Sequence, residues 1–497
     1  MDSNAHEVEL LAKYCLVSRY WPNCGRLFVL FSRISPIQRF ECLAISCVVS
    51  IPEANRQDSV YIAFPLLLVV TAAAPFFLFG NLVVRGLLGV IVAFCLAAAA
   101  VTSTKSDLNH LKQNIGSPVI ICMIPAFWMG LQTMPLQSIG LYHPIWVSAA
   151  TALGYPLQST MTIDIGATLV ALSCYVLMIT LALLAAVIAL DRNRAEKILF
   201  ALLVASSLAS LSLIVHDLSG LTFLDVSAPH TAESRSSVEN LAALGVIIST
   251  AAIIRAFERS ETRRLSHRSN SNALMWTLIS AVLGVAALIV AFTALMLSAS
   301  VSLIIATTCG WIMMLGIALI RRTDFSKWTS VALVTMLAFG VFVLASRSGS
   351  GNADLTLRFA GHAPASLLLL TDRILVDIGA LGTGAGTFDA LVPIYRDVGD
   401  DVTTALPATS AAAIAIELGR VALWISVILA VAWAGMLIRA SLQRGRDSFY
   451  ALMGAGCLVA LTLGAFTNNG LFALPTTIIV AAVLGLAQAQ SVSRTQA

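Results

Sequence analysis

The residues best suited to chemistry are arginines and a histidine in one long polar segment. Arg358 and His362 stand four apart in "RFAGH", Arg373 interrupts the apolar run "LLLLTDRILV", and Arg396 lies in "YRD". Guanidinium groups bind phosphate oxygens through charge-assisted, often bidentate hydrogen bonds. An imidazole can take up a hydroxyl proton near neutral pH. These residue types predict catalytic roles for His362 and Arg373 and phosphate binding by Arg358 and Arg396.

Each of these residues also has a structural interpretation. Gly361 can break the helix that would bring Arg358 and His362 onto one face. Arg373 can pair with an aspartate one turn later or anchor the chain at the membrane surface. Arg396 can pair with the aspartate that follows it.

A glycine-rich stretch, "LGTGAGTFD", follows Arg373 and places Gly382, Gly384 and Gly386 at alternate positions. Backbone amides of such a loop can cradle phosphate, but no GxxxxGK[ST] motif follows. We therefore predict a structural turn that packs the segment tightly. Glu417, just before the next apolar stretch, is predicted to support the site by holding an arginine.

A second segment, 136–164, contains no Lys or Arg and reads "LQSIGLYHPIWVSAATALGYPLQSTMTID". His143 and Trp146 are predicted to bind substrate, because an aromatic ring and an imidazole can stack on and hydrogen-bond a sugar. Anchoring in the interfacial belt is the alternative. The segment has the composition of an interfacial re-entrant piece.

The composition defines the class of protein. Of 497 residues, 58% are hydrophobic and 11% are charged, whereas soluble domains carry about 25% charged residues. The mean hydropathy is +0.88. We predict an all-α, polytopic integral membrane protein with about 12 transmembrane helices and one large periplasmic loop of short helices.

Apolar runs long enough to cross the bilayer identify the spans. The runs are 61–80, 82–102, 118–135, 165–190, 198–215, 241–254, 274–293, 303–320, 329–346, 420–438, 451–467 and 471–487.

The positive-inside rule orients these spans. With both termini in the cytoplasm, most of the 30 basic residues fall in cytoplasmic segments, so the net charge of +4 gives no reason to expect nucleic acid. The predicted divisions are a cytoplasmic N-terminal segment (1–60), a bundle of spans 1–9 (61–346), the large periplasmic loop (347–419), spans 10–12 (420–487) and a cytoplasmic tail (488–497).

This arrangement resembles the O-antigen ligase and polysaccharide polymerase superfamily. The matching features are the late external loop, "GTGAGTF" followed by an apolar segment with Tyr, "ELG" entering a span, and "LYHPIWVSAATALG". The resemblance implies a bacterial inner-membrane glycan ligase or polymerase that uses no metal and no nucleotide cofactor. Its partners would be a polyprenyl-diphosphate-linked glycan, an acceptor glycan or glycolipid, and the lipid bilayer.

The chain departs from that family at two places. The family carries a His shortly before its E-x-G segment and an Arg in a short external loop between middle spans. The corresponding stretches here are "ALPATSAAAIAIELG" and "LSASVS", so those roles would fall to other residues. The alternative functions are an inactive scaffold among polysaccharide-export proteins and a transporter of lipid-linked glycans. A transporter needs charged residues inside its spans, which are scarce here.

Overall fold

The structure is a computed structural model. It describes residues 53–79, 82–102, 105–137, 140–219, 232–265, 271–298, 300–323, 354–361, 363–396, 406–443 and 447–491. The chain separates into two compact units, Met1–Asp58 and Ser59–Ala497, and the account below concerns the second.

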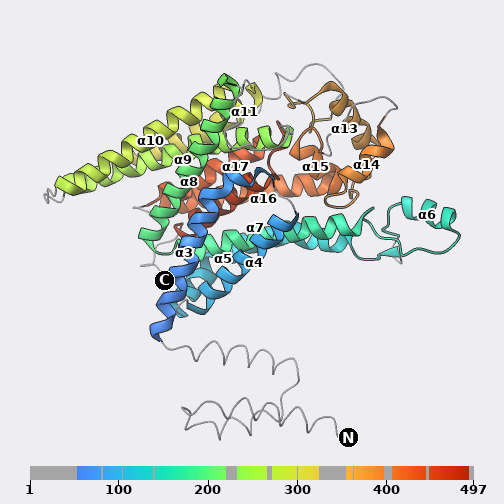
Figure 1. Cartoon of the computed structure of the whole chain (residues 1–497), viewed down its shortest axis with the longest axis horizontal. Helices are drawn as coiled ribbons and strands as arrows, with labels where there is room; N and C mark the ends of the chain where they lie inside the picture. Colours follow the sequence, from blue (N-terminus) through green and yellow to red (C-terminus); the bar gives the residue numbers. More distant parts are fainter. Residues whose placement is uncertain are drawn as a thin grey trace, which may run out of the picture. The chain divides into compact units, whose positions relative to one another are not determined.

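The described residues form helices and no strand (Figure 1). The long helices are α3 (Glu53–Ala73), α4 (Leu82–Thr102), α5 (Lys105–Gln132), α7 (Ile165–Ile188), α8 (Arg192–Ser219), α9 (Ala232–Leu265), α10 (Ser271–Leu297), α11 (Val301–Thr323), α16 (Arg420–Gln443), α17 (Phe449–Gly464) and α18 (Leu474–Ala489). The short ones are η3 (Ala74–Phe79), α6 (Ile145–Leu153), α13 (Ala365–Asp377), α14 (Phe388–Tyr395) and α15 (Ser410–Glu417).

The predicted all-α fold is confirmed for the described residues, and the length and composition of its helices are consistent with a helical membrane protein. Within the described ranges, 6 helices are long and apolar enough to cross a membrane, namely α7, α8, α9, α10, α11 and α16. Shorter apolar helical segments of 10–17 residues cover the end of α3 with the start of η3, parts of α4 and α5, and all of α17 and α18. The predicted span at 329–346 lies outside the described residues, so the number of spans remains a prediction.

α9 lies at the centre of the bundle, where it packs against α8, α10, α11 and α17. Of the most apolar 18-residue stretch of α9, 83% is buried inside the protein, whereas the corresponding share for α16 is 17%. A helix that is apolar all round needs either protein or lipid on every side. The exposed Trp424, Ile428 and Val431 of α16 therefore form a surface suited to lipid.

Small residues allow the inner helices to approach closely. Any side chain at Gly310 of α11 would overlap the backbone of Gly456 in α17, and one at Gly485 of α18 would overlap Ala182 of α7. Lipid supplies no hydrophobic drive for helix association, so close van der Waals packing has to supply much of the stability.

The three short helices α13, α14 and α15 lie beside one another in Figure 1 and share a small apolar core. Ile374, Phe388 and Ile416 are members of this core, one from each helix. α13 contains the apolar run around Arg373 and ends at Asp377, before the glycine stretch. The apolar stretch after the glycines also forms a helix, α14, which was not predicted.

A polar connection fixes this part of the chain to the bundle. The amide and hydroxyl of Ser410 donate to the Asn468 carbonyl at 2.9 and 3.0 Å. The Asn468 side chain exchanges two hydrogen bonds, of 3.1 and 3.0 Å, with Asn240 of α9. The start of α15 is therefore fixed to α9 of the bundle through Asn468.

At another place in the bundle, Glu196 of α8 pairs with two arginines of α9, Arg255 and Arg259. Arg255 is 5% exposed, and its guanidinium also lies 5.5 Å from the centre of the Phe200 ring. A buried arginine needs its counter-charge, because desolvation without a partner is costly.

Glu196→Ala should therefore lower the unfolding free energy by about 3 kcal/mol or more, since it leaves Arg255 buried without a carboxylate. Thermal unfolding in detergent measures this. Arg194→Ala is the matched control, because Arg194 forms only a surface pair of 3.7 Å with Asp191. Equal melting temperatures for both variants would contradict the role of Glu196.

Candidate functional site

The glycine turn after α13 is the best-defined part of the candidate site. Gly382, Gly384 and Gly386 have φ values of 80°, 111° and 74°. Such values favour glycine, because a Cβ is strained in this region. A Cβ at Gly382 would overlap the backbone at Glu417 and Gly419, and a Cβ at Gly384 would overlap the Thr162 side chain. The repeated glycines thus serve close backbone packing.

Hydrogen bonds hold this turn from two sides. On one side, the Thr383 amide donates to Ile416 O at 3.0 Å and the Gly384 amide donates to Glu417 O at 2.9 Å. On the other side, the Ile163 amide donates to Thr383 O at 2.9 Å. The turn therefore joins the end of α15 to the segment before α7.

The end of α5 reaches the same place. The fully buried Gln132 donates from Nε2 to Glu417 O at 3.0 Å, and Trp128 donates from Nε1 to Leu418 O at 2.9 Å. These bonds satisfy carbonyl groups at the α15 C-terminus that have no partner within the helix. Neither donor was singled out from sequence.

Glu417 supports the turn through its side chain. Its Oε2 accepts a 2.8 Å hydrogen bond from the Gly386 amide, at the start of α14. Burial raises the pKa of Glu417 to about 7, and hydrogen bonds from the Gly386 and Phe388 amides oppose only part of this rise. An arginine was expected as its partner. Arg420, three residues after Glu417, pairs instead with Asp354 at 2.9 Å.

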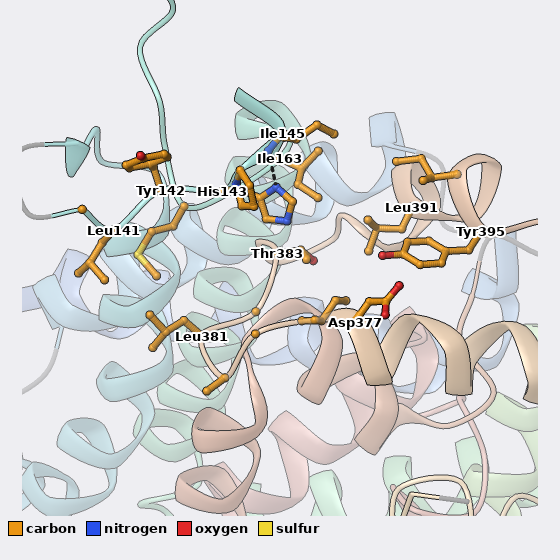
Figure 2. A pocket seen from close by; sticks show the side chains of 18 residues that line it. Leu141, Tyr142, His143, Ile145, Ile163, Asp377, Leu381, Thr383, Leu391 and Tyr395 are labelled. Carbon is orange, nitrogen blue, oxygen red and sulfur yellow. Dashed lines mark hydrogen bonds between the residues drawn. The ribbon is translucent and has the colours of Figure 1, made fainter. Parts of the chain in front are cut away.

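A cavity of about 640 Å³ lies between the turn and the segment before α7. Its lining comes from 140–145, Met161 and Ile163 on one side, and from 377–383, Leu391, Ile394 and Tyr395 on the other. Figure 2 shows His143 and Tyr395 on opposite sides of it, with the Asp377 carboxylate beside the Tyr395 hydroxyl. The volume is typical of sites for small ligands.

His143 has a defined hydrogen-bonding role in this cavity. Its Nδ1 accepts the Ile145 amide at 3.3 Å, and its own amide donates to Thr160 O at 2.9 Å. Partial burial lowers the pKa of His143, which favours the neutral ring. Because Nδ1 is an acceptor, the proton of that neutral ring is on Nε2. His143 is therefore a hydrogen-bond donor at Nε2.

Asp377 and Tyr395 form the polar group opposite His143. Burial raises the pKa of Tyr395, and the charge of Asp377 with a hydrogen bond to it raises the pKa further. The phenol therefore stays protonated. From the sequence, Asp377 is expected only to pair with Arg373. No local pattern distinguishes Asp377 from the other aspartates of this segment.

The other predicted residues lie outside this lining. Trp146 donates from Nε1 to Thr162 O at 3.0 Å and so fixes the segment that carries His143. Arg373 and Arg396 are exposed, the first one turn before Asp377 and the second directly after Tyr395. Arg358 is exposed in a run of turns rather than in a helix. His362 lies outside the described residues.

Among the described residues, no three His, Cys, Asp or Glu side chains gather as a metal-binding set. Neither the models of known protein families nor the curated proteins contain a match to this chain. The resemblance to the O-antigen ligase superfamily therefore stays a prediction.

Gly382→Ala should destabilise the protein by more than about 2 kcal/mol, because it adds strain at positive φ to an overlap with the α15 terminus. Thermal unfolding measures the effect. Gly379→Ala is the matched control three residues earlier, where a Cβ meets nothing within 4 Å. Similar melting temperatures for the two variants would show that the turn does not need glycine.

The raised pKa of Glu417 predicts a pH dependence of stability. The folded state keeps this proton up to about pH 7, whereas the unfolded chain releases it near its ordinary value of 4.5. The contribution, at most about 3 kcal/mol, is full below that value and is lost as the pH rises through about 7. Glu417→Gln keeps an acceptor for Gly386 and should flatten the dependence in thermal unfolding between those values. An unchanged pH profile would contradict this prediction.

Proposed function

We propose that this chain is a bacterial inner-membrane glycan ligase or polymerase. It would transfer a glycan from a polyprenyl-diphosphate carrier to an acceptor sugar on the periplasmic face, in surface polysaccharide biosynthesis. In this proposal the chain crosses the membrane about 12 times, both termini lie in the cytoplasm, and the segment 347–419 is periplasmic.

The cavity supports this proposal most directly. It is shared by the two segments that the charge pattern assigns to the same side of the membrane, 136–164 and 347–419. Aromatic rings, a hydrogen-bond donor and a carboxylate lie around it, and these are the groups that bind sugars. A site built where two connections meet is held by the rigid bundle beneath it.

The exposed arginines support the donor part of the proposal. Arg373 and Arg396 flank the residues Asp377 and Tyr395, which line the cavity. A diphosphate leaving group carries negative charge, and guanidinium groups there would stabilise it as the bond to the sugar breaks. The prenyl tail of the carrier would remain in the bilayer beside the lipid-suited face of the bundle.

Glycan profiling in a deletion strain tests the proposed function. Loss of the gene should remove transferred glycan or long polymer, and the wild-type gene should restore it. Arg373→Ala and Arg396→Ala should each restore at most about a tenth, because each removes a charge-assisted bond to phosphate. Immunoblots of membranes confirm equal protein levels.

Arg439→Ala is the matched control, since Arg439 is an exposed residue near the other end of α16. It should complement fully. Full complementation by both site variants would favour the scaffold alternative. An unchanged glycan profile in the deletion strain would overturn the proposed function.

A further inference from the structure

The charge of the cavity limits what it can bind. Among the residues that line it, Asp377 supplies a carboxylate and none is a lysine or arginine. His143 is no source of positive charge, because its Nδ1 already accepts the Ile145 amide. An anion inside the cavity would meet Asp377 without a counter-charge in the lining.

Helix ends reinforce this preference. Asp377 ends α13 and Tyr395 ends α14, so two helix C-termini border the cavity. The Arg420 guanidinium donates to Leu375 O in the last turn of α13 at 2.9 Å, so the C-terminus of α14 is the one that adds partial negative charge. The N-terminus of α6 also borders it, but its first amides are occupied. Ile145 N donates to the His143 ring and Trp146 N donates to His143 O. The backbone therefore offers no anion site there.

The polar groups suit a ring that carries hydroxyls. His143 offers an N–H donor at Nε2, and Asp377 offers oxygen acceptors on the other side (Figure 2). Tyr142 and Tyr395 add aromatic surface, and Leu381 and Ile394 add apolar surface. Sugars present both kinds of surface, since the C–H face packs on aromatic rings while hydroxyls donate and accept.

We propose that this cavity binds the acceptor sugar as an uncharged, hydroxyl-bearing ring and discriminates against anionic ligands such as sugar phosphates. Asp377 accepts hydrogen bonds from the sugar hydroxyls, and His143 donates one. The role of this sugar as the acceptor rests on the proposed function, whereas the preference for an uncharged ring follows from the residues that line the cavity. The donor diphosphate then binds outside it, near Arg373 and Arg396.

Saturation-transfer NMR on the full-length protein in lipid nanodiscs tests the selectivity. The protein is purified in a detergent without a sugar head group. The probes are the methyl glycosides of glucose, galactose, mannose and N-acetylglucosamine, and glucose 1-phosphate. At least one methyl glycoside should bind in the millimolar range, and glucose 1-phosphate should bind at least about tenfold more weakly.

Two variants test the assigned residues. Asp377→Asn should weaken glycoside binding about tenfold, because a charged acceptor becomes neutral, and should reduce the discrimination against glucose 1-phosphate. Ile394→Trp should weaken binding, because a larger side chain narrows the cavity beside Tyr395. Asp372→Asn is the matched control on the same helix and should change neither.

The proposal is overturned if no methyl glycoside binds, if glucose 1-phosphate binds as well as the glycosides, or if Asp372→Asn matches Asp377→Asn. The glycan profile of the deletion strain is independent of these measurements. If the protein binds sugar but the glycan profile of the deletion strain is unchanged, the sugar site is supported and the transferase function is contradicted. If the glycan profile changes but the protein binds no methyl glycoside, the transferase function is supported and the sugar site is contradicted.

Discussion

The backbone of the glycine turn is hydrogen-bonded on both sides, and the arrangement of the cavity depends on this. Thr383 bonds the end of α15 through its amide and Ile163 through its carbonyl. Asp377 precedes the turn, Tyr395 follows it, and His143 is tied through its amide to Thr160, close to Ile163. Only residues that tolerate positive φ allow the backbones to approach this closely. The turn therefore sets the spacing of groups that come from distant parts of the chain.

The bundle supplies the rigidity that this turn requires. Lipid cannot hydrate polar groups, so charges and amides within the helices have to be satisfied by protein. Glu196 with its two arginines, and Asn240 with Asn468, meet this requirement between helices. The second of these pairs also carries the link to Ser410 at the start of α15. The same need for polar satisfaction thus stabilises the bundle and fixes one end of the short-helix region.

Hydropathy predicted the long helices well, because membrane thickness imposes length and composition on each helix separately. It missed α14, since glycines precede it and Pro393 lies within it, both of which resemble a turn. The set of residues that lines the cavity could not be predicted from the sequence. The two sides of the cavity lie more than two hundred residues apart, as His143 and Asp377 illustrate, and no local periodicity records a long-range contact. The partner of Glu417 was missed for a related reason, because a backbone amide has no signature in sequence.

A transferase of the proposed kind has to bring together an anionic leaving group and an uncharged nucleophile. The leaving group needs positive charge beside it, whereas the site of the nucleophile has to disfavour anions. The short helices can provide both within a few residues. Asp377 and the C-terminal end of α14 make the cavity unfavourable to anions, while Arg373, one turn before Asp377, and Arg396, one residue beyond α14, carry positive charge outside the lining. Helix polarity and residue order thus place the two kinds of charge next to each other without mixing them. A carboxylate among the lining residues is then a selectivity element, because it excludes the ligand that the neighbouring arginines attract.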